Sequence, residues 1–278
     1  MNCFLVSDLH GKVDRYKSLF NQIKIEEPEV VLLGGDLLPG FSTIFGDFVN
    51  EFLIPEFSNL KQKMQSQYPQ IYVILGNDDP RSEEQKFIDA EEHGLWTYLN
   101  EKTTDYNGWN FFGYSYIPPS PFQLKDWEKF DVSRYVDIGC ISPLEGMRTV
   151  KVDPVNIEYY TIAKDLDRLL SGDLSKTICL FHAPPYNTFL DRAALDGKKI
   201  DHVQIDVHVG SIAIKNFIES KKPAFTLHGH IHESTQITGS WKQKIGSTLA
   251  CSSAWEGSEL ALIKFDPEKP DDIQRVLI

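Results

Sequence analysis

The stretch CFLVSDLHG, residues 3–11, is a short apolar run followed at once by Asp8 and His10. The same arrangement returns in VVLLGGD, residues 30–36, and in IYVILGND, residues 71–78. Each apolar run has the length of a buried strand, and the polar side chains come where the run ends. The first third of the chain therefore predicts three strands with polar residues at their carboxyl ends.

Helical patterns separate these runs. One apolar face at helical spacing consists of Tyr16, Leu19, Phe20 and Ile23. A second apolar stripe consists of Phe45, Phe48, Val49 and Phe52, and we expect it to stop near Pro55. Alternating strands and helices are typical of parallel strands joined by crossover helices, so the sequence predicts the α/β class.

The middle of the chain is less regular. Trp109–Tyr114 predicts a strand, but residues 115–156 are rich in Pro, Gly, aromatic and charged residues and have no sustained period. A loop of this length inside a compact domain is either a functional lid or insertion, or a surface excursion packed by its own aromatic side chains. We expect one domain over residues 1–278 with an irregular insertion or lid at about 115–156.

Regular patterns return after residue 160. A helical stripe is formed by Ile162, Leu166, Leu169 and Leu170, with Gly172 expected as its C-terminal cap. Ser211 can cap the N-terminus of a further helix that carries Ile214, Phe217 and Ile218.

Strands are predicted at Thr177–Phe181 and Ala224–Leu227. Three further short runs, spaced by Gly, Ser and Trp with no helix between them, are Ser234–Ile237, Thr248–Ser252 and Leu260–Phe265. Their spacing indicates antiparallel strands.

Charge and cysteine content narrow the class of protein. The 278 residues carry 40 acidic and 28 basic side chains, a formal net charge of −12, which argues against broad binding of nucleic acid. None of the four cysteines forms a C-x-x-C pair, and Cys3 and Cys179 lie inside apolar runs, as expected of buried thiols in a reducing compartment. The N-terminus has no basic signal-peptide region, and no apolar stretch approaches the roughly 18 residues of a membrane span. We expect a cytoplasmic protein without membrane contact, and the sequence leaves the oligomeric state open.

Polar residues follow five of the predicted strands. They are Asp8, His10, Asp36, Asn77, His182, His230 and His232. Ligands of open α/β sheets bind outside the carboxyl ends of the strands, so segments far apart in sequence would deliver these side chains to one crevice. Mixed carboxylate and imidazole ligands suit Mn, Fe, Zn, Co or Ni better than Ca or Mg. Taken singly, motifs such as G-N-D are common in turns, and the prediction rests on the ordered set.

The ordered set DLH, GGD, GND, FHAPP and GHIH, which spans residues 8 to 232, resembles the calcineurin-like metallophosphoesterase superfamily. The resemblance implies a four-layer α/β/β/α sandwich of two mixed sheets flanked by helices. It implies two divalent metal ions, manganese first among the candidates, bridged by Asp36. By the same resemblance Asp8, His10 and His232 complete one site, and Asn77, His182 and His230 complete the other. The implied reaction is hydrolysis of a small phosphomonoester or phosphodiester by a hydroxide held between the metals.

The sequence departs from the family pattern at Asp78, where the family usually has a histidine that assists the leaving group. An aspartate titrates near ~3.9, and nearby cations favour its charged form, so Asp78 is expected to be a poor proton donor. Either another group donates the proton, such as metal-bound water or His208, or the substrates have leaving groups that need little protonation. Asp78 and His208 are therefore the candidate catalytic residues. His208 can instead be a histidine of the capping region before the last crossover helix.

Two other functions stay open. One is a catalytically weak metal-binding scaffold module of the same fold, which the intact set of seven ligand residues disfavours. The other is a Mn-dependent nuclease, which is disfavoured by the acidic balance and by the lack of interleaved basic and aromatic residues.

Overall fold

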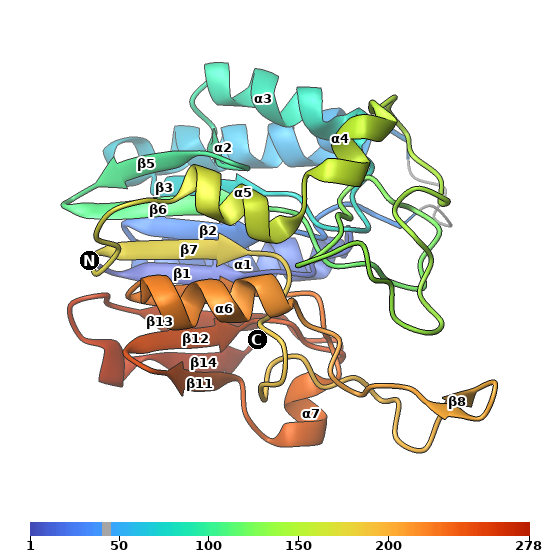
Figure 1. Cartoon of the computed structure of the whole chain (residues 1–278). Coiled ribbons are helices and arrows are strands. Elements are labelled where there is room, and N and C mark those ends of the chain that lie inside the picture. Colours follow the sequence, from blue (N-terminus) through green and yellow to red (C-terminus); the bar gives the residue numbers. More distant parts are fainter. Residues whose placement is uncertain (41–45) are drawn as a thin grey trace.

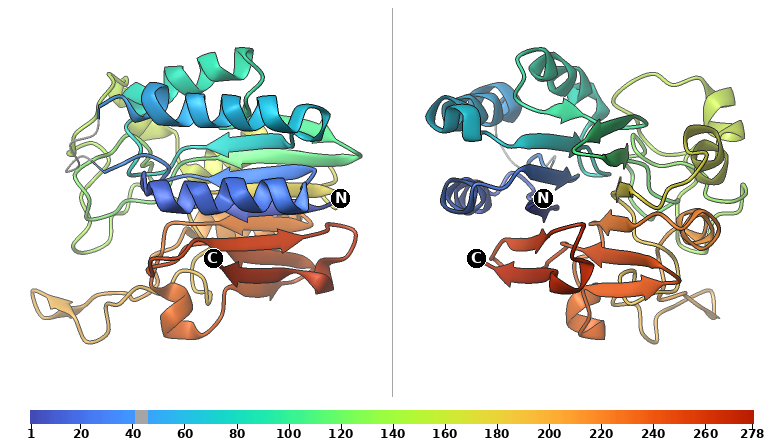
Figure 2. Two further views of the ribbon diagram at one scale, coloured as in Figure 1. Left: turned by 180° about the vertical axis from the view of Figure 1, so that it is seen from behind. Right: turned by 90° about the vertical axis from the view of Figure 1, so that its left-hand side faces the viewer.

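The computed structural model describes residues 1–40 and 46–278. Two six-stranded mixed sheets lie face to face, and helices cover their outer faces (Figure 1). The right-hand view of Figure 2 shows the four layers, with the blue helices on one side and the yellow and orange helices on the other. This is the α/β/β/α sandwich that the sequence predicts.

The first sheet has the strand order β14-β13-β1-β2-β3-β4. Its parallel strands are β1 (Cys3–Val6), β2 (Val30–Gly34), β3 (Gln70–Ile74) and β4 (Thr97–Tyr98). Its antiparallel strands are β13 (Ala261–Phe265) and β14 (Gln274–Leu277). The crossover helices of this half are α1 (Val13–Glu26), α2 (Ile54–Met64) and α3 (Glu84–Glu92).

The second sheet has the strand order β11-β12-β10-β7-β6-β5. Its parallel strands are β6 (Trp109–Tyr114), β7 (Thr177–Phe181), β10 (Phe225–His228) and β12 (Thr248–Ser252). Antiparallel edges are formed by β5 (Thr103–Tyr106) and β11 (Lys242–Ile245). The helices of this half are α4 (Pro154–Tyr159), α5 (Ile162–Leu169), α6 (Ile212–Lys221) and α7 (Ser234–Thr238). A separate small hairpin is formed by β8 (Lys199–Ile200) and β9 (Val203–Gln204).

The core follows from the period of two along each strand. One apolar cluster contains Leu5 and Leu32 of the first sheet together with Leu180 and Leu227 of the second, and it lies between the sheets. The alternate positions of the same strands face the helices. Because both faces of the central strands are covered, these strands read as continuous apolar runs in the sequence.

Three local predictions are wrong, and the first is the helix end at Pro55. A π-helical turn, η1 (Val49–Leu53), leads directly into α2, and Pro55 stands in the first turn of that helix. A proline is accepted there because its missing N–H has no helical partner in the first turn and its fixed φ suits the helix. Phe45, part of the same predicted stripe, lies outside the described residues.

The predicted cap at Gly172 is also wrong. Helix α5 ends at Leu169, and Leu170 is already extended, with φ −124° and ψ 115°. The chain leaves the helix early because the side chain of Leu170 is buried in the core. Gly172 has a φ of +84° in the turn that leads towards β7.

The third wrong prediction is a strand at Ser234–Ile237, which is the short helix α7. The N–H of Gly239, at a φ of +71°, donates to the carbonyl of Thr235 and closes the helix. The predicted antiparallel pairing holds for β11 with β12 and for β13 with β14, whereas β12 runs parallel to β10.

Residues 115–153, all of them described, contain isolated β-bridges but no helix or named strand. A fully buried ion pair holds this segment, with Lys125 Nζ 2.6 Å from Glu128 Oε2. The single-domain organisation and the role of this segment as a lid remain predictions. Among the helices of the described chain, none combines the length and the apolar composition needed to cross a membrane.

Candidate metal centre

The seven strand-end residues named from the sequence come from both sheets. Asp8 and His10 follow β1, Asp36 follows β2 and Asn77 follows β3, all in the first sheet. In the second sheet, His182 follows β7, and His230 and His232 follow β10. The structure brings their side chains together at the carboxyl ends of these parallel strands.

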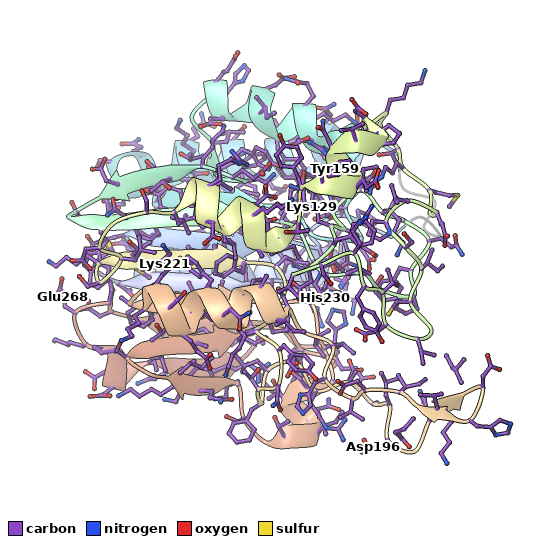
Figure 3. All side chains as sticks on the ribbon, viewed as in Figure 1. Lys129, Tyr159, Asp196, Lys221, His230 and Glu268 are labelled. Carbon is purple, nitrogen blue, oxygen red and sulfur yellow. The ribbon has the colours of Figure 1, made fainter. Side chains whose placement is uncertain are left out.

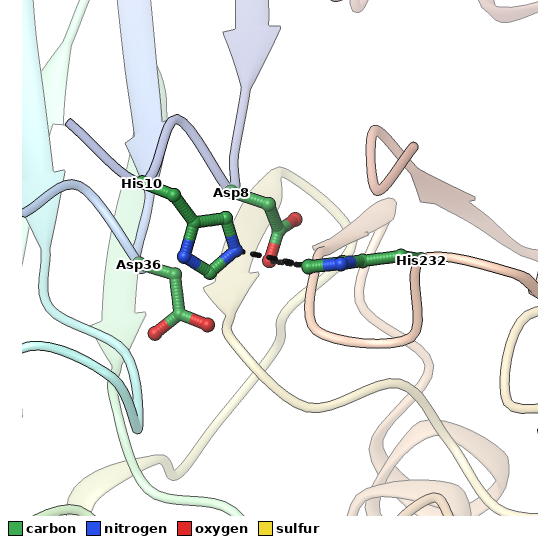
Figure 4. A group of neighbouring side chains, drawn as sticks. All are labelled: Asp8, His10, Asp36 and His232. Carbon is green, nitrogen blue, oxygen red and sulfur yellow. Dashed lines mark hydrogen bonds and ion pairs between the residues drawn. The ribbon is translucent and has the colours of Figure 1, made fainter. Parts of the chain in front are cut away.

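Four of these residues form the first group, which is drawn in Figure 4. The group consists of Asp8, His10, Asp36 and His232, whose potential ligand atoms all lie within 4.8 Å of one another. His10 Nε2 lies 3.1 Å from His232 Nε2, and His232 Nε2 lies 3.2 Å from Asp8 Oδ1. Imidazole nitrogens and carboxylate oxygens this close are arranged as the ligands of one cation would be.

A second group shares Asp36 with the first. It consists of Asp36, His182 and His230, again with potential ligand atoms within 4.8 Å of one another. His182 Nε2 lies 3.3 Å from Asp36 Oδ2 and 3.0 Å from Asn77 Oδ1. The amide oxygen of Asn77 therefore lies beside the second group.

Strained backbone accompanies these side chains. Asp8, His10, Asp36 and His230 have φ values of +56°, +46°, +53° and +74°. A non-glycine residue in this left-handed region costs on the order of 1 kcal/mol or more, and such residues cluster at functional sites. The turns after the strands thus aim the side chains into the site at a cost that the surrounding packing offsets.

Two glycines permit this close approach. A Cβ on Gly76 would collide with the carboxylate of Asp36 and the ring of His182. A Cβ on Gly229 would stand 2.7 Å from Asp8 Oδ2 and from Ser7 Oγ. Glycine is needed at both positions because the backbone itself forms the wall of the site.

Asp79 braces the loops, and sequence reasoning gave it no role. Its buried carboxylate accepts hydrogen bonds from the N–H groups of Leu37, Leu38 and Gly76 at 2.7–2.9 Å. It therefore fixes the loop after β2 to the loop after β3. Burial and the nearby Asp36 carboxylate raise the pKa of Asp79 to about 7. Its position three residues after a strand-ending glycine resembles a turn aspartate and carried no signal of this bridging.

Arg15 is a second positioning residue that the sequence did not reveal. It is a buried arginine on α1, and its Nη1 donates to the carbonyl oxygen of Asp8 at 2.6 Å. Its Nη2 donates to the carbonyl oxygen of Gly257. Arg15 thus ties the strained turn at Asp8 to the C-terminal part of the chain.

The ionisation of the site matches a cation-binding cluster. Burial opposes charge on Asp8, yet the hydrogen bond and charge of His232 hold the pKa of Asp8 well below its usual range. Burial likewise opposes charge on His182, but Asp36 raises the pKa of His182 to about 10. Burial and the neighbouring His182 lower the pKa of His230 to about 3. Two buried carboxylates draw protons onto nearby imidazoles, and metal ions compete with protons for the same nitrogens. The donor set fits divalent cations.

Asp78 lies at the edge of the first group. Its Oδ2 is 3.6 Å from His10 Nδ1, and its backbone N–H donates to Asp36 Oδ1 at 2.8 Å. Burial and the Asp36 carboxylate raise the pKa of Asp78, which opposes the effect expected of nearby cations.

The structure does not bring His208 into either group. His208 Nδ1 lies 2.8 Å from Oδ1 of the fully buried Asp191, and the ring lines a cavity of about 410 Å³. His228 is buried, with Nδ1 2.8 Å from the carbonyl oxygen of Ala183, so it packs inside the sheet beside the site.

Comparison with known proteins agrees with this arrangement. The family model described as calcineurin-like phosphoesterase matches residues 1–234. The uncharacterized protein MJ1162 of Methanocaldococcus jannaschii is 39% identical over 94 residues, which are 32% of this chain and only 37% of that relative. Two solved structures at 14% identity each align over 99% of this chain and 98% of their own. One has a TM-score of 0.61, and the other, TT1561 of Thermus thermophilus, has a TM-score of 0.58. At that identity the two structures show a shared fold.

Proposed function

The chain belongs to the calcineurin-like phosphoesterase family, and from this premise we propose that it is a binuclear metal-dependent phosphoesterase that hydrolyses a phosphomonoester or phosphodiester. The observation that supports the proposal most directly is the place of Asp36 in both ligand groups. One buried carboxylate between two sets of ligands is the arrangement that a pair of bridged cations requires.

The two proposed cation sites divide the seven residues between them. Asp8, His10 and His232 would hold one cation and Asn77, His182 and His230 the other, with Asp36 between them. Manganese is the first candidate, and Fe, Zn, Co and Ni suit the same donors. When bound, two such cations lower the pKa of water and neutralise charge on the phosphoryl oxygens.

The protein's own side chains would manage the protons. Asp78 Oδ2 faces His10 Nδ1, where it can hold a proton at the edge of the site. Because His208 Nδ1 is hydrogen-bonded to Asp191 Oδ1, its Nε2 is the atom that could pass a proton to a leaving group. Without the family's usual histidine at position 78, we propose that aryl and anhydride-type substrates are turned over faster than alkyl phosphates.

The proposed substrate is a small phosphorylated molecule rather than nucleic acid, because the net charge of −12 opposes a polyphosphate backbone. A cytoplasmic location belongs to the same proposal.

Metal analysis combined with an ester assay tests the function. Purified protein loaded with Mn²⁺ should bind two equivalents and hydrolyse p-nitrophenyl phosphate or bis(p-nitrophenyl) phosphate. Two bound equivalents with no hydrolysis of either ester would contradict the proposal and favour the metal-binding scaffold, the alternative that Asp78 motivates.

A further inference from the structure

A cavity of about 410 Å³ lies between two irregular segments, residues 118–140 and residues 186–212, and we call it the loop cavity. In Figure 1 the second segment projects from the body of the molecule with the β8 hairpin at its tip. The volume is in the range of about 300–1,000 Å³ that is usual for small-molecule sites.

The walls of the loop cavity are mostly apolar. Pro118, Ile138, Ile200 and Ile205 line it, together with the aromatic ring of Tyr186. Several apolar side chains here are open to solvent, among them Ile138 at 43% exposure and Val203 at 48%. Exposed apolar surface concentrated around one cavity indicates that a ligand covers it.

The charge of the loop cavity is of one sign. Among the described residues that line it, none is lysine or arginine, whereas Asp131, Asp137 and Asp206 contribute carboxylates. Asp131 accepts hydrogen bonds from Ser211 Oγ at 2.6 Å and from the N–H of Ile212 at 2.7 Å, so its charge is directed at the N-terminus of α6. Of the other two, Asp206 also accepts a hydrogen bond from the N–H of His208 at 2.9 Å, and Asp137 is the carboxylate left to act on a ligand.

Asp137 and Asp206 both line the loop cavity, one from each irregular segment. Asp206 accepts a hydrogen bond from the Tyr186 hydroxyl at 2.6 Å, while Asp137 has no ion pair or side-chain hydrogen bond within the described part of the chain. Burial and the Asp206 carboxylate both raise the pKa of Asp137. Two carboxylates that line a largely apolar cavity with no lysine or arginine in its lining would be stabilised by a positively charged guest. The ring of Tyr186 adds a face that favours the same charge.

Segment 186–212, which lines part of the loop cavity, is linked to the ligand residues of the candidate metal centre along the chain and by a hydrogen bond. Tyr186 follows His182 by four residues, and the N–H of Ala194 donates to Glu233 Oε1 at 3.1 Å, next to His232. Figure 3 shows His230 at the end of the sheets from which both irregular segments project. Segment 186–212 is thus held near His182 at its start and near His232 through Ala194.

We infer that the loop cavity binds an organic cation with an apolar body, such as a substituted ammonium group, and that this cation is part of the phosphodiester cleaved at the metal centre. The second half of this inference rests on the proposed phosphoesterase function. This inference excludes nucleotides and other polyanions as preferred substrates. Their negative charges outside the reacting phosphate would be repelled by the carboxylates of Asp137 and Asp206.

Two esters that differ only in charge test the inference. They are 4-nitrophenyl phosphorylcholine and its neutral carbon analogue, 4-nitrophenyl 3,3-dimethylbutyl phosphate. We expect the KM of the cationic ester to be about tenfold below that of the neutral ester, and Asp137→Asn or Asp206→Asn to remove most of this ratio. Asp201→Asn removes the same charge from the hairpin turn of the same loop, outside the cavity, and should keep the ratio.

A binding measurement tests the cavity independently of ester hydrolysis. Metal-free protein titrated with benzyltrimethylammonium in a calorimeter should bind it, and Asp137→Asn should weaken the affinity about tenfold. Binding without hydrolysis of any ester supports the cavity and contradicts the phosphoesterase. Hydrolysis with equal KM values for the two esters contradicts the assignment of the cation to the substrate. Absence of binding contradicts the inference that the loop cavity binds an organic cation.

Discussion

Asp36 is almost fully buried and adopts a left-handed backbone, and its two carboxylate oxygens face different partners. Oδ2 lies 3.3 Å from His182 Nε2, while Oδ1 accepts the N–H of Asp78 at 2.8 Å. Such a residue is poorly suited to stabilising a fold, because its buried charge and its strained backbone both cost free energy. Its placement is accounted for by the ligand that it would hold. We therefore propose that the chemistry of the site depends on this carboxylate and on the side chains beside it that can hold a proton.

Replacing Asp36 by asparagine keeps the shape of the side chain and removes its charge. We expect Asp36→Asn to lower metal occupancy at both sites and to reduce ester hydrolysis by more than about 100-fold. Elemental analysis and the rate with bis(p-nitrophenyl) phosphate measure the two effects. Asp173→Asn, at an exposed turn before β7, should change neither, and an Asp36→Asn protein with two equivalents of metal would refute the bridging role.

We propose that Asp78 governs how the hydrolysis rate depends on the leaving group. A positioned general acid contributes roughly 10²–10⁴-fold, mostly for leaving groups that are poor without protonation. We expect Asp78→His to narrow the rate difference between aryl and alkyl phosphates by about 100-fold. A series of esters with leaving groups of increasing pKa gives the slope of the logarithm of the hydrolysis rate against leaving-group pKa. An unchanged slope in Asp78→His would count against this role.

Cys140 reports on the loop cavity that it lines. Burial and Asp137 raise the pKa of its thiol from 9.0 to about 11. Because the thiolate is the reactive form, alkylation by iodoacetamide at pH 8 should be about 100-fold slower than for an unperturbed thiol. The rate should rise about tenfold for each pH unit until pH approaches 11. Peptide mass spectrometry of native protein follows the reaction, in which buried Cys3, Cys179 and Cys251 should not take part. A rate that levels off near pH 9 would contradict the raised pKa.

At the scale of the element, the site depends on how loops are fastened to the ends of strands and helices. Asp79 joins the loops after β2 and β3, and Arg15 of α1 holds the turn after β1. Asp131 performs the same function for the irregular segment 115–153, because its carboxylate receives the N-terminus of α6. These residues touch no proposed ligand atom, yet they decide where the ligand residues and the cavity walls lie.

Loss of the Asp131 carboxylate should destabilise the protein. The carboxylate supplies a helix N-terminus with hydrogen bonds and with a favourable charge, so Asp131→Ala should lower the free energy of unfolding by about 2 kcal/mol. Urea denaturation measures the change. Asp153→Ala removes the N-cap of the short, exposed helix α4 and should cost less than about 1 kcal/mol. Equal losses in the two variants would contradict a special role for Asp131.

At the scale of the whole molecule, the candidate metal centre joins the two sheets. Asp8, Asp36 and Asn77 belong to one sheet, and His182, His230 and His232 belong to the other. A cation held by both sets closes the open end of the sandwich at the point where the strands terminate. The free energy of metal binding would therefore add to the stability of the whole fold.

Metal should accordingly protect the protein against heat. At a metal concentration about 100 times the Kd, binding stabilises the folded state by about 2.7 kcal/mol, which corresponds to a Tm increase of about 5 °C or more. Differential scanning calorimetry of protein treated with EDTA and then with Mn²⁺ gives the shift. His182→Gln removes a ligand from the second sheet and should abolish most of it. A full shift in that variant would contradict the role of His182 as a metal ligand.

The α/β class, most strand positions and the seven candidate ligand residues could be predicted from the sequence, because apolar period and strand-end polarity are local signals. The strand at Thr177–Phe181 and the helix capped by Ser211 are found as predicted. Local signals failed at three places. Pro55 is accepted in the first turn of α2, helix α5 ends before Gly172 because Leu170 is buried, and Gly239 closes Ser234–Ile237 as a helix.

Contacts between residues far apart in the chain could be found only in the folded structure. The bridges made by Asp79 and Arg15, the separation of His208 from both ligand groups, and the acidic loop cavity all join residues far apart in the chain. The distances between such residues and the burial of their side chains arise from the packing of two sheets. The periodicity of the sequence does not predict them.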